Sequence, residues 1–183
     1  TEIAVAVATG TKVCGEFFAK RGVVAYFYAE DMKRQIRNRV RAELAGADRK
    51  LPVGRLFLEP RGEFLDITRD EDLAAIIASC RQLGTLDLLV LDPLRDIHSG
   101  EEDKSDSMRD VMRRIRLLGE LLGCTVLVVH HAGKPSEANA KRGGGQRLRG
   151  SGSIHGSVDS GIYFLDCTGD GVGTFKNTVE SEI

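Results

Sequence analysis

Four side chains that could bind a nucleotide stand at the ends of three apolar segments of this chain. The segments span residues 23–29, 86–92 and 124–131. Their ends carry Glu30, Asp92, His130 and His131. Buried strands of a parallel sheet have this composition, because helices cover both faces and only the carboxyl end needs polar groups. Ligands of open α/β sheets bind at that edge, so the sequence predicts that these side chains line a nucleotide site.

The two acids suit different roles in nucleotide hydrolysis. If the strands before them are neighbours, Glu30 and Asp92 lie close together, because adjacent strands are separated by about 4.8 Å. In P-loop hydrolases an acid at a strand end holds Mg²⁺, while another group orients the attacking water. Asp92 fits the metal role and Glu30 the water role. Each acid could instead be only the start of a loop, and Glu30 could be a helix N-terminal acid favoured by the helix dipole.

The two histidines are adjacent, so on a strand they point to opposite faces and cannot both bind one metal ion from the same side. This geometry argues against a zinc pair. One histidine could contact a γ-phosphate or a bound metal while the other packs or hydrogen-bonds within the sheet. The alternative is that His130 and His131 are both structural.

Length and composition indicate a single domain, residues 1–183, of an ordinary soluble protein. The chain is 42% hydrophobic and 29% charged with a formal net charge of -1, so binding to nucleic acid would require a local basic patch. No apolar stretch reaches the roughly 20 residues that cross a bilayer, and no secretion signal begins the chain. Four scattered cysteines argue against a zinc site or a disulfide framework. We therefore expect a cytoplasmic protein that does not bind membranes.

Apolar residues at helical spacing predict three helices in the middle of the chain. These span residues 32–45, 71–83 and 107–122. Ser107 and Asp110 resemble a capping box at the start of the last helix, and Gly123 is expected to end it.

Short strands are expected at residues 56–58 and 64–67. Residues 160–166 and 172–177 flank a glycine-rich turn and predict an antiparallel hairpin at the sheet edge. Strands that alternate with helices of this length are typical of a parallel sheet with right-handed crossovers. The fold class is therefore α/β, with a mostly parallel sheet.

Residues 1–8 have the composition of an apolar helix that begins without a cap. An α/β unit normally opens with a strand and a turn before such a helix. We therefore expect the chain to be truncated at its N-terminus, with the first strand and the following loop upstream of Thr1.

A glycine-rich segment, residues 133–152, carries five cations and a single acid. The cations are Lys134, Lys141, Arg142, Arg147 and Arg149. Clustered cations attract phosphates, so the segment could bind a nucleic-acid backbone, although no interleaved aromatic residue favours base stacking. The alternative is a solvated loop. The loop over residues 96–106 is acidic and should repel DNA unless it points away or binds metal.

Taken in order, four motifs resemble the core of RecA-like ATPases, and more narrowly the RepA-type hexameric replicative helicases of plasmids and phages. The motifs are residues 24–31, 89–95, 123–134 and 148–153. With their intervals they span about residues 10–177, which is nearly the whole chain. The resemblance implies a RecA-like three-layer fold, ATP and Mg²⁺ as cofactors, single-stranded DNA as partner and assembly into a homo-hexameric ring.

The resemblance also implies roles for individual residues. Asp92 matches the Walker B aspartate that holds Mg²⁺ through water, and Glu30 matches the catalytic glutamate that polarises the attacking water. His130 or His131 matches the polar sensor that couples the γ-phosphate to the DNA loops. Arg149 aligns with the arginine finger that completes the site of a neighbouring subunit. The channel-facing loop of the family, with its DNA-binding cations, falls on Lys134, Lys141, Arg142 and Arg147.

One family motif is missing, the Gly-x-x-x-x-Gly-Lys-Ser/Thr loop whose amides and lysine cradle the phosphates. Relatives carry that loop just before the first helix, so we expect it upstream of Thr1. This chain alone should then hydrolyse ATP poorly, whereas its parent protein should hydrolyse it well. Three alternatives stay open: a recombinase-like or regulatory ATPase that does not unwind DNA, a non-catalytic DNA-binding or assembly module, and a degenerate, inactive relative.

Overall fold

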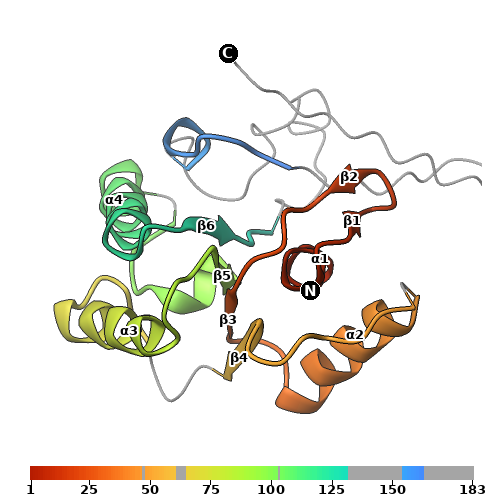
Figure 1. The fold of residues 1–183 in the computed structure, drawn as a ribbon. Coiled ribbons are helices and arrows are strands. Elements are labelled where there is room, and N and C mark those ends of the chain that lie inside the picture. The colour runs from red at the N-terminus through yellow and green to blue at the C-terminus, as the bar shows by residue number, and fades with distance from the viewer. Residues whose placement is uncertain (47, 61–64, 103, 132–153, 163–183) are drawn as a thin grey trace, which may run out of the picture.

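A four-stranded parallel sheet forms the centre of the molecule (Figure 1). The strand order is β4-β3-β5-β6, and neighbouring strands pair in parallel throughout. The strands are β3 (Val24–Tyr28), β4 (Leu56–Pro60), β5 (Leu88–Asp92) and β6 (Thr125–Val128). The computed structural model describes residues 1–46, 48–60, 65–102, 104–131 and 154–162.

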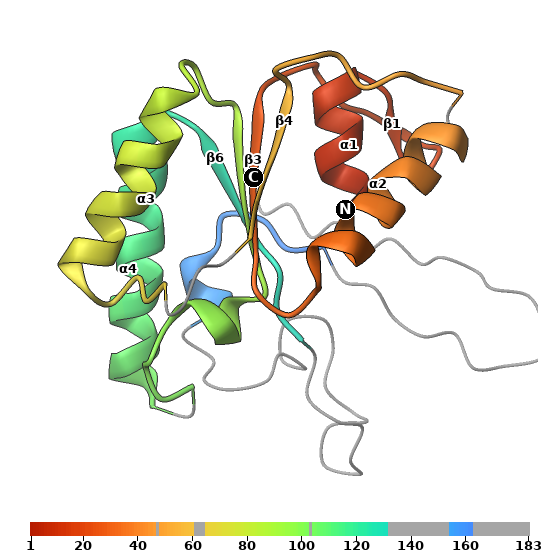
Figure 2. The same cartoon turned by 90° about the horizontal axis from the view of Figure 1, so that it is seen from below.

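Helices cover both faces of the sheet and make a three-layer α/β fold, as expected (Figure 2). One face carries α1 (Glu2–Thr9) and α2 (Lys33–Gly46). The other face carries α3 (Asp70–Gln82) and α4 (Ser105–Leu122). Within the described part of the chain, no helix has the length and apolar character needed to cross a membrane.

The alternation of side chains along β3 explains why the strand is apolar at every position. Val24 and Tyr26 belong to the core on the α1 and α2 face, whereas Ala25 and Phe27 belong to the core on the α3 and α4 face. β5 follows the same rule, and its last residue, Asp92, is the only one of the strand that is not fully buried. A strand covered on both faces accepts polar groups mainly where it ends, and this places the candidate site at the carboxyl edge.

The observed helices lie within two residues of the predicted ones. Gly123 ends α4 in the left-handed conformation, with φ 63°, as the sequence predicts. The predicted capping box at the start of α4 is wrong. Lys104 is the N-cap without a side-chain cap, and Asp110 instead accepts hydrogen bonds from Arg113 and Arg114. Two cations within reach of Asp110 provide stronger partners than a backbone amide.

Three segments differ from the sequence-based expectation or lie partly outside the described residues. The strand expected at residues 64–67 is wrong for the described residues 65–67: Ile67 is buried, but it lies in a turn that precedes α3. An unpredicted hairpin, β1 (Lys12–Val13) and β2 (Phe17–Phe18), follows α1 as a separate antiparallel sheet. The predicted hairpin over residues 160–166 and 172–177 lies outside the described residues, except for residues 160–162, which form no strand.

Candidate nucleotide site

Glu30 and Asp92 follow two strands that lie side by side and run in the same direction. β3 pairs with β5 in parallel with Tyr28 opposite Asp92. The ladder continues for one more residue, because the amide of Ala29 donates to the carbonyl oxygen of Asp92 at 2.9 Å. Glu30 is the next residue, so both acids lie at the carboxyl edge of the sheet, on neighbouring strands.

His131 reaches the same place from the other side of β5. Pairing continues past the end of β6, where the amide of Val129 donates to the carbonyl of Leu91 at 2.9 Å. The His131 Nε2 atom then lies 3.5 Å from Glu30 Oε2, and both side chains are about half exposed. β5 separates β6 from β3, so this contact spans the end of the strand that carries Asp92. The structure therefore brings Glu30, Asp92 and His131 together.

His130 points away from this cluster. Val128 packs with the α3 and α4 core and Val129 with the α1 and α2 core, so the alternation directs His130 to the α3 and α4 side. There it lies near His98, an imidazole that is only 9% exposed. Burial lowers the pKa of His98, whereas the nearby acids Glu102 and Asp66 oppose this effect. The two histidines thus diverge as expected, although the strand predicted over residues 124–131 ends at Val128 and both histidines follow it.

Tyr26 is a member of the site that the sequence did not single out. Its hydroxyl donates to Asp92 Oδ2, and its side chain is 1% exposed. Burial, followed by the hydrogen bond to Asp92, raises the pKa of the Tyr26 phenol, which stays protonated as a donor at neutral pH. The sequence carries only a weak signal for Tyr26: a buried tyrosine in an apolar strand normally needs a hydrogen-bond partner, but Tyr28 in the same strand shares that pattern.

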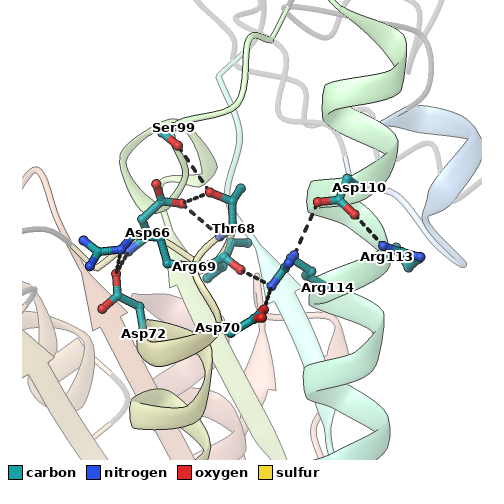
Figure 3. A network of polar contacts seen from close by, with 10 residues as sticks. Asp66, Thr68, Arg69, Asp70, Asp72, Ser99, Asp110, Arg113 and Arg114 are labelled. Carbon is teal, nitrogen blue, oxygen red and sulfur yellow. Dashed lines mark hydrogen bonds and ion pairs between the residues drawn. The ribbon is translucent and has the colours of Figure 1, made fainter.

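A polar network holds the loop that leaves Asp92 (Figure 3). This loop continues through η1 (Leu94–Ile97) to Ser99, whose hydroxyl contacts that of Thr68 at 3.2 Å. Asp66 accepts from both the amide and the hydroxyl of Thr68, at 2.9 Å and 2.6 Å. Burial alone would raise the pKa of Asp66, but the hydrogen bonds from Ser99 and Thr68 bring it below its usual range.

The same network ties α3 to α4. Arg114 on α4 binds Asp70 at the start of α3 at 2.7 Å and Asp110 on its own helix at 3.3 Å. Just before α3, the amide of Ile67 donates to the carbonyl of Ile97 at 2.8 Å, which joins this region to the loop after β5.

The amino end of α1 points toward the carboxyl edge of the sheet. At the opposite edge, the amide of Gly22 donates to the carbonyl of Val7, and Gly10 lies against Arg21 just before β3. α1 therefore runs antiparallel to β3 (Figure 2). A helix amino end carries unpaired amides and partial positive charge, which favour a phosphate group.

The donor set at this edge fits Mg²⁺. Carboxylate oxygens suit this ion, which usually takes one or two of them and completes its shell with water and substrate phosphates. No cluster of three or more His, Cys, Asp or Glu side chains in the described ranges could hold a metal by protein ligands alone. Asp92, whose carboxylate lies at the strand end, is the residue that would hold the ion.

The remaining predicted site residues lie outside the described residues. They are Lys134, Lys141, Arg142, Arg147 and Arg149. The described chain resumes at Ile154, which is buried in the core beside α4.

A parallel sheet covered by helices on both faces, with two acids at the carboxyl ends of neighbouring strands, is an arrangement found in nucleotide-binding domains of the P-loop kind. Comparison with known families agrees. Residues 1–137 match the model of an AAA domain family. The chain belongs to this family of AAA-type P-loop ATPases.

Proposed function

We propose that this chain is the motor domain of an Mg²⁺-dependent ATPase of the RepA-type replicative helicase family. The observation that carries the proposal is the meeting of Glu30, Asp92 and His131 at one edge of three adjacent strands. The four motifs of the sequence support the narrower family. In this proposal the protein assembles into a hexameric ring in the cytoplasm and translocates on single-stranded DNA.

Each member of the cluster has a distinct task in the proposed reaction. Asp92 would hold Mg²⁺, which neutralises charge on the phosphates when bound. Glu30 accepts a hydrogen bond from the attacking water and raises its nucleophilicity. His131 lies 3.5 Å from Glu30, so a change at the γ-phosphate that moves Glu30 would be transmitted to His131. The chain then continues directly into the basic segment.

The basic segment would connect hydrolysis to movement along DNA. Its DNA-binding cations are Lys134, Lys141, Arg142 and Arg147. Arg149 would contact the nucleotide of the neighbouring subunit and complete that site. Because the segment starts next to His131 and carries Arg149, it would respond to the nucleotides of two subunits.

Replacing Asp92 by alanine is expected to weaken Mg²⁺-dependent nucleotide binding by roughly 10- to 100-fold, because the metal loses its protein anchor. The measurement is a nucleotide titration with and without Mg²⁺, in a protein that includes the expected upstream phosphate loop. Asp92→Asn is a second variant that removes the charge but keeps an acceptor for Tyr26. Asp87→Asn is the matched control, because Asp87 lies just before β5 at the opposite edge and accepts from the amide of Val23. An unchanged Mg²⁺ dependence in both Asp92 variants would rule out the metal role.

Strand displacement on a forked DNA substrate distinguishes a helicase from the other ATPases. We expect the wild-type protein to separate the strands in the presence of ATP and Mg²⁺, and the Asp92→Ala protein to leave the fork intact. Hydrolysis stimulated by single-stranded DNA without displacement would favour the recombinase-like or regulatory ATPase. A protein with its phosphate loop that binds DNA but no nucleotide would be the non-catalytic module.

A further inference from the structure

The hydrogen bond between Tyr26 and Asp92 joins the interior of one strand to the end of the next. In the register of β3 and β5, Tyr26 stands opposite Val90, so Asp92 is two residues further along the neighbouring strand. Such diagonal partners on one face of a sheet are within reach of an aromatic side chain. The hydroxyl of Tyr26 meets Asp92 Oδ2 in this way.

We propose that Tyr26 is a positioning residue that holds the Asp92 carboxylate in the orientation needed to bind Mg²⁺. This inference rests on the proposed function, in which Asp92 is the metal-holding residue. Asp92 is the last residue of its strand, where its carboxylate can rotate about the side-chain torsions unless a partner holds it. One donor on Oδ2 restricts those torsions and leaves Oδ1 for the hydration shell of the ion.

The Tyr26 ring is itself held in place. It is 1% exposed and belongs to the core between the sheet and helices α1 and α2. The ring of Tyr28 packs against it edge to face, with centroids 6.2 Å apart and an interplanar angle of 77°. Because the ring is packed in the core, its hydroxyl has a fixed position, and the hydrogen bond from that hydroxyl restricts the orientation of the Asp92 carboxylate. Partners of this kind around a metal ligand typically contribute substantially to metal affinity.

Tyr28 provides a matched control within the same strand. Its side chain is 3% exposed and lies on the same face as Tyr26. Its hydroxyl is buried and has no hydrogen-bond partner among the described residues. Tyr28→Phe therefore removes a hydroxyl from a second buried tyrosine of the same strand without removing a hydrogen bond to Asp92.

The test compares Tyr26→Phe and Tyr28→Phe in a protein that includes the expected upstream phosphate loop. The readout is the Mg²⁺ concentration that gives half-maximal binding of a fluorescent ATP analogue, which does not depend on turnover. We expect Tyr26→Phe to raise this concentration by about 10-fold. Tyr28→Phe should stay within about twofold of the wild type, since the hydroxyl that it removes makes no hydrogen bond to Asp92. Thermal unfolding of both variants controls for a general loss of stability.

A double-mutant cycle with Asp92→Ala, which removes the acceptor of the Tyr26 hydroxyl, makes the inference specific. If Tyr26 acts only through the Asp92 carboxylate, Tyr26→Phe should have no further effect in the Asp92→Ala background. A Tyr26→Phe protein that titrates like the wild type, while Asp92→Asn is impaired, would overturn the positioning role and leave the proposed function intact. If Mg²⁺ has no influence on nucleotide binding by the wild type, both the proposed function and this inference fail.

Discussion

Replacing Glu30 by glutamine is expected to reduce ATP turnover by roughly 10²- to 10⁴-fold, the range typical of the loss of a general base. Glutamine has the shape of glutamate but cannot take a proton from the attacking water. Glu30 is about half exposed at the edge of the sheet, so its loss should not disturb the core. Nucleotide binding should persist, since Asp92 remains in place. Single-turnover hydrolysis and a separate nucleotide-binding titration measure the two quantities.

Glu120→Gln is the matched control for this variant. Glu120 is an exposed residue near the end of α4, on the α3 and α4 side of the sheet. The same change of charge at that position should leave turnover unaltered. If Glu30→Gln hydrolyses ATP at the wild-type rate, the water-activating role belongs to another residue, and the close contact with His131 would then be only structural.

Replacing Arg149 by alanine is expected to lower turnover by roughly 10³- to 10⁵-fold, which is the contribution of an arginine finger in other nucleotide hydrolases. Nucleotide binding should remain, because the finger stabilises charge that develops in the transition state rather than the bound substrate. Arg81→Ala is the control, since Arg81 lies in the last turn of α3. Turnover that survives in Arg149→Ala would remove the finger assignment.

Mixing subunits tests whether Arg149 acts on a neighbour. A Glu30→Gln subunit keeps Arg149, and an Arg149→Ala subunit keeps Glu30. When the two inactive proteins assemble together, some interfaces combine an intact Glu30 with an intact Arg149 of the adjacent subunit. We expect hydrolysis to reappear in the mixture. If Arg149 acted within its own subunit, the mixture would stay inactive, and the proposed coupling between subunits would be contradicted.

The elements that were predicted incorrectly share a physical cause. Residues 64–67 were expected to form a strand because apolar residues indicate burial, but burial does not show whether Ile67 lies in a strand or in a turn. The β1 and β2 strands have two residues each, too few for any periodicity to appear. Asp110 resembled a capping residue, yet it binds Arg113 and Arg114. In each case the local pattern was compatible with several partners.

The residues of the site also differ in how clearly the sequence indicates them. Asp92 and Glu30 stand out in the sequence, because a carboxylate after an apolar run marks the end of a buried strand. Tyr26 does not, since tyrosine is common in strands and its partner lies 66 residues away in the chain. Only its contact with Asp92 distinguishes it from Tyr28.

The sequence by itself determined where β3 and β5 end, because covering both faces of a sheet demands apolar residues everywhere except at those ends. It also predicted that the two histidines diverge, although both lie beyond the end of β6. Only the tertiary structure decided that β5 lies between β3 and β6, which places Glu30 and His131 across the end of the strand that carries Asp92. Strand order depends on how the crossover helices pack on the two faces, and that packing is the sum of contacts between segments far apart in the chain.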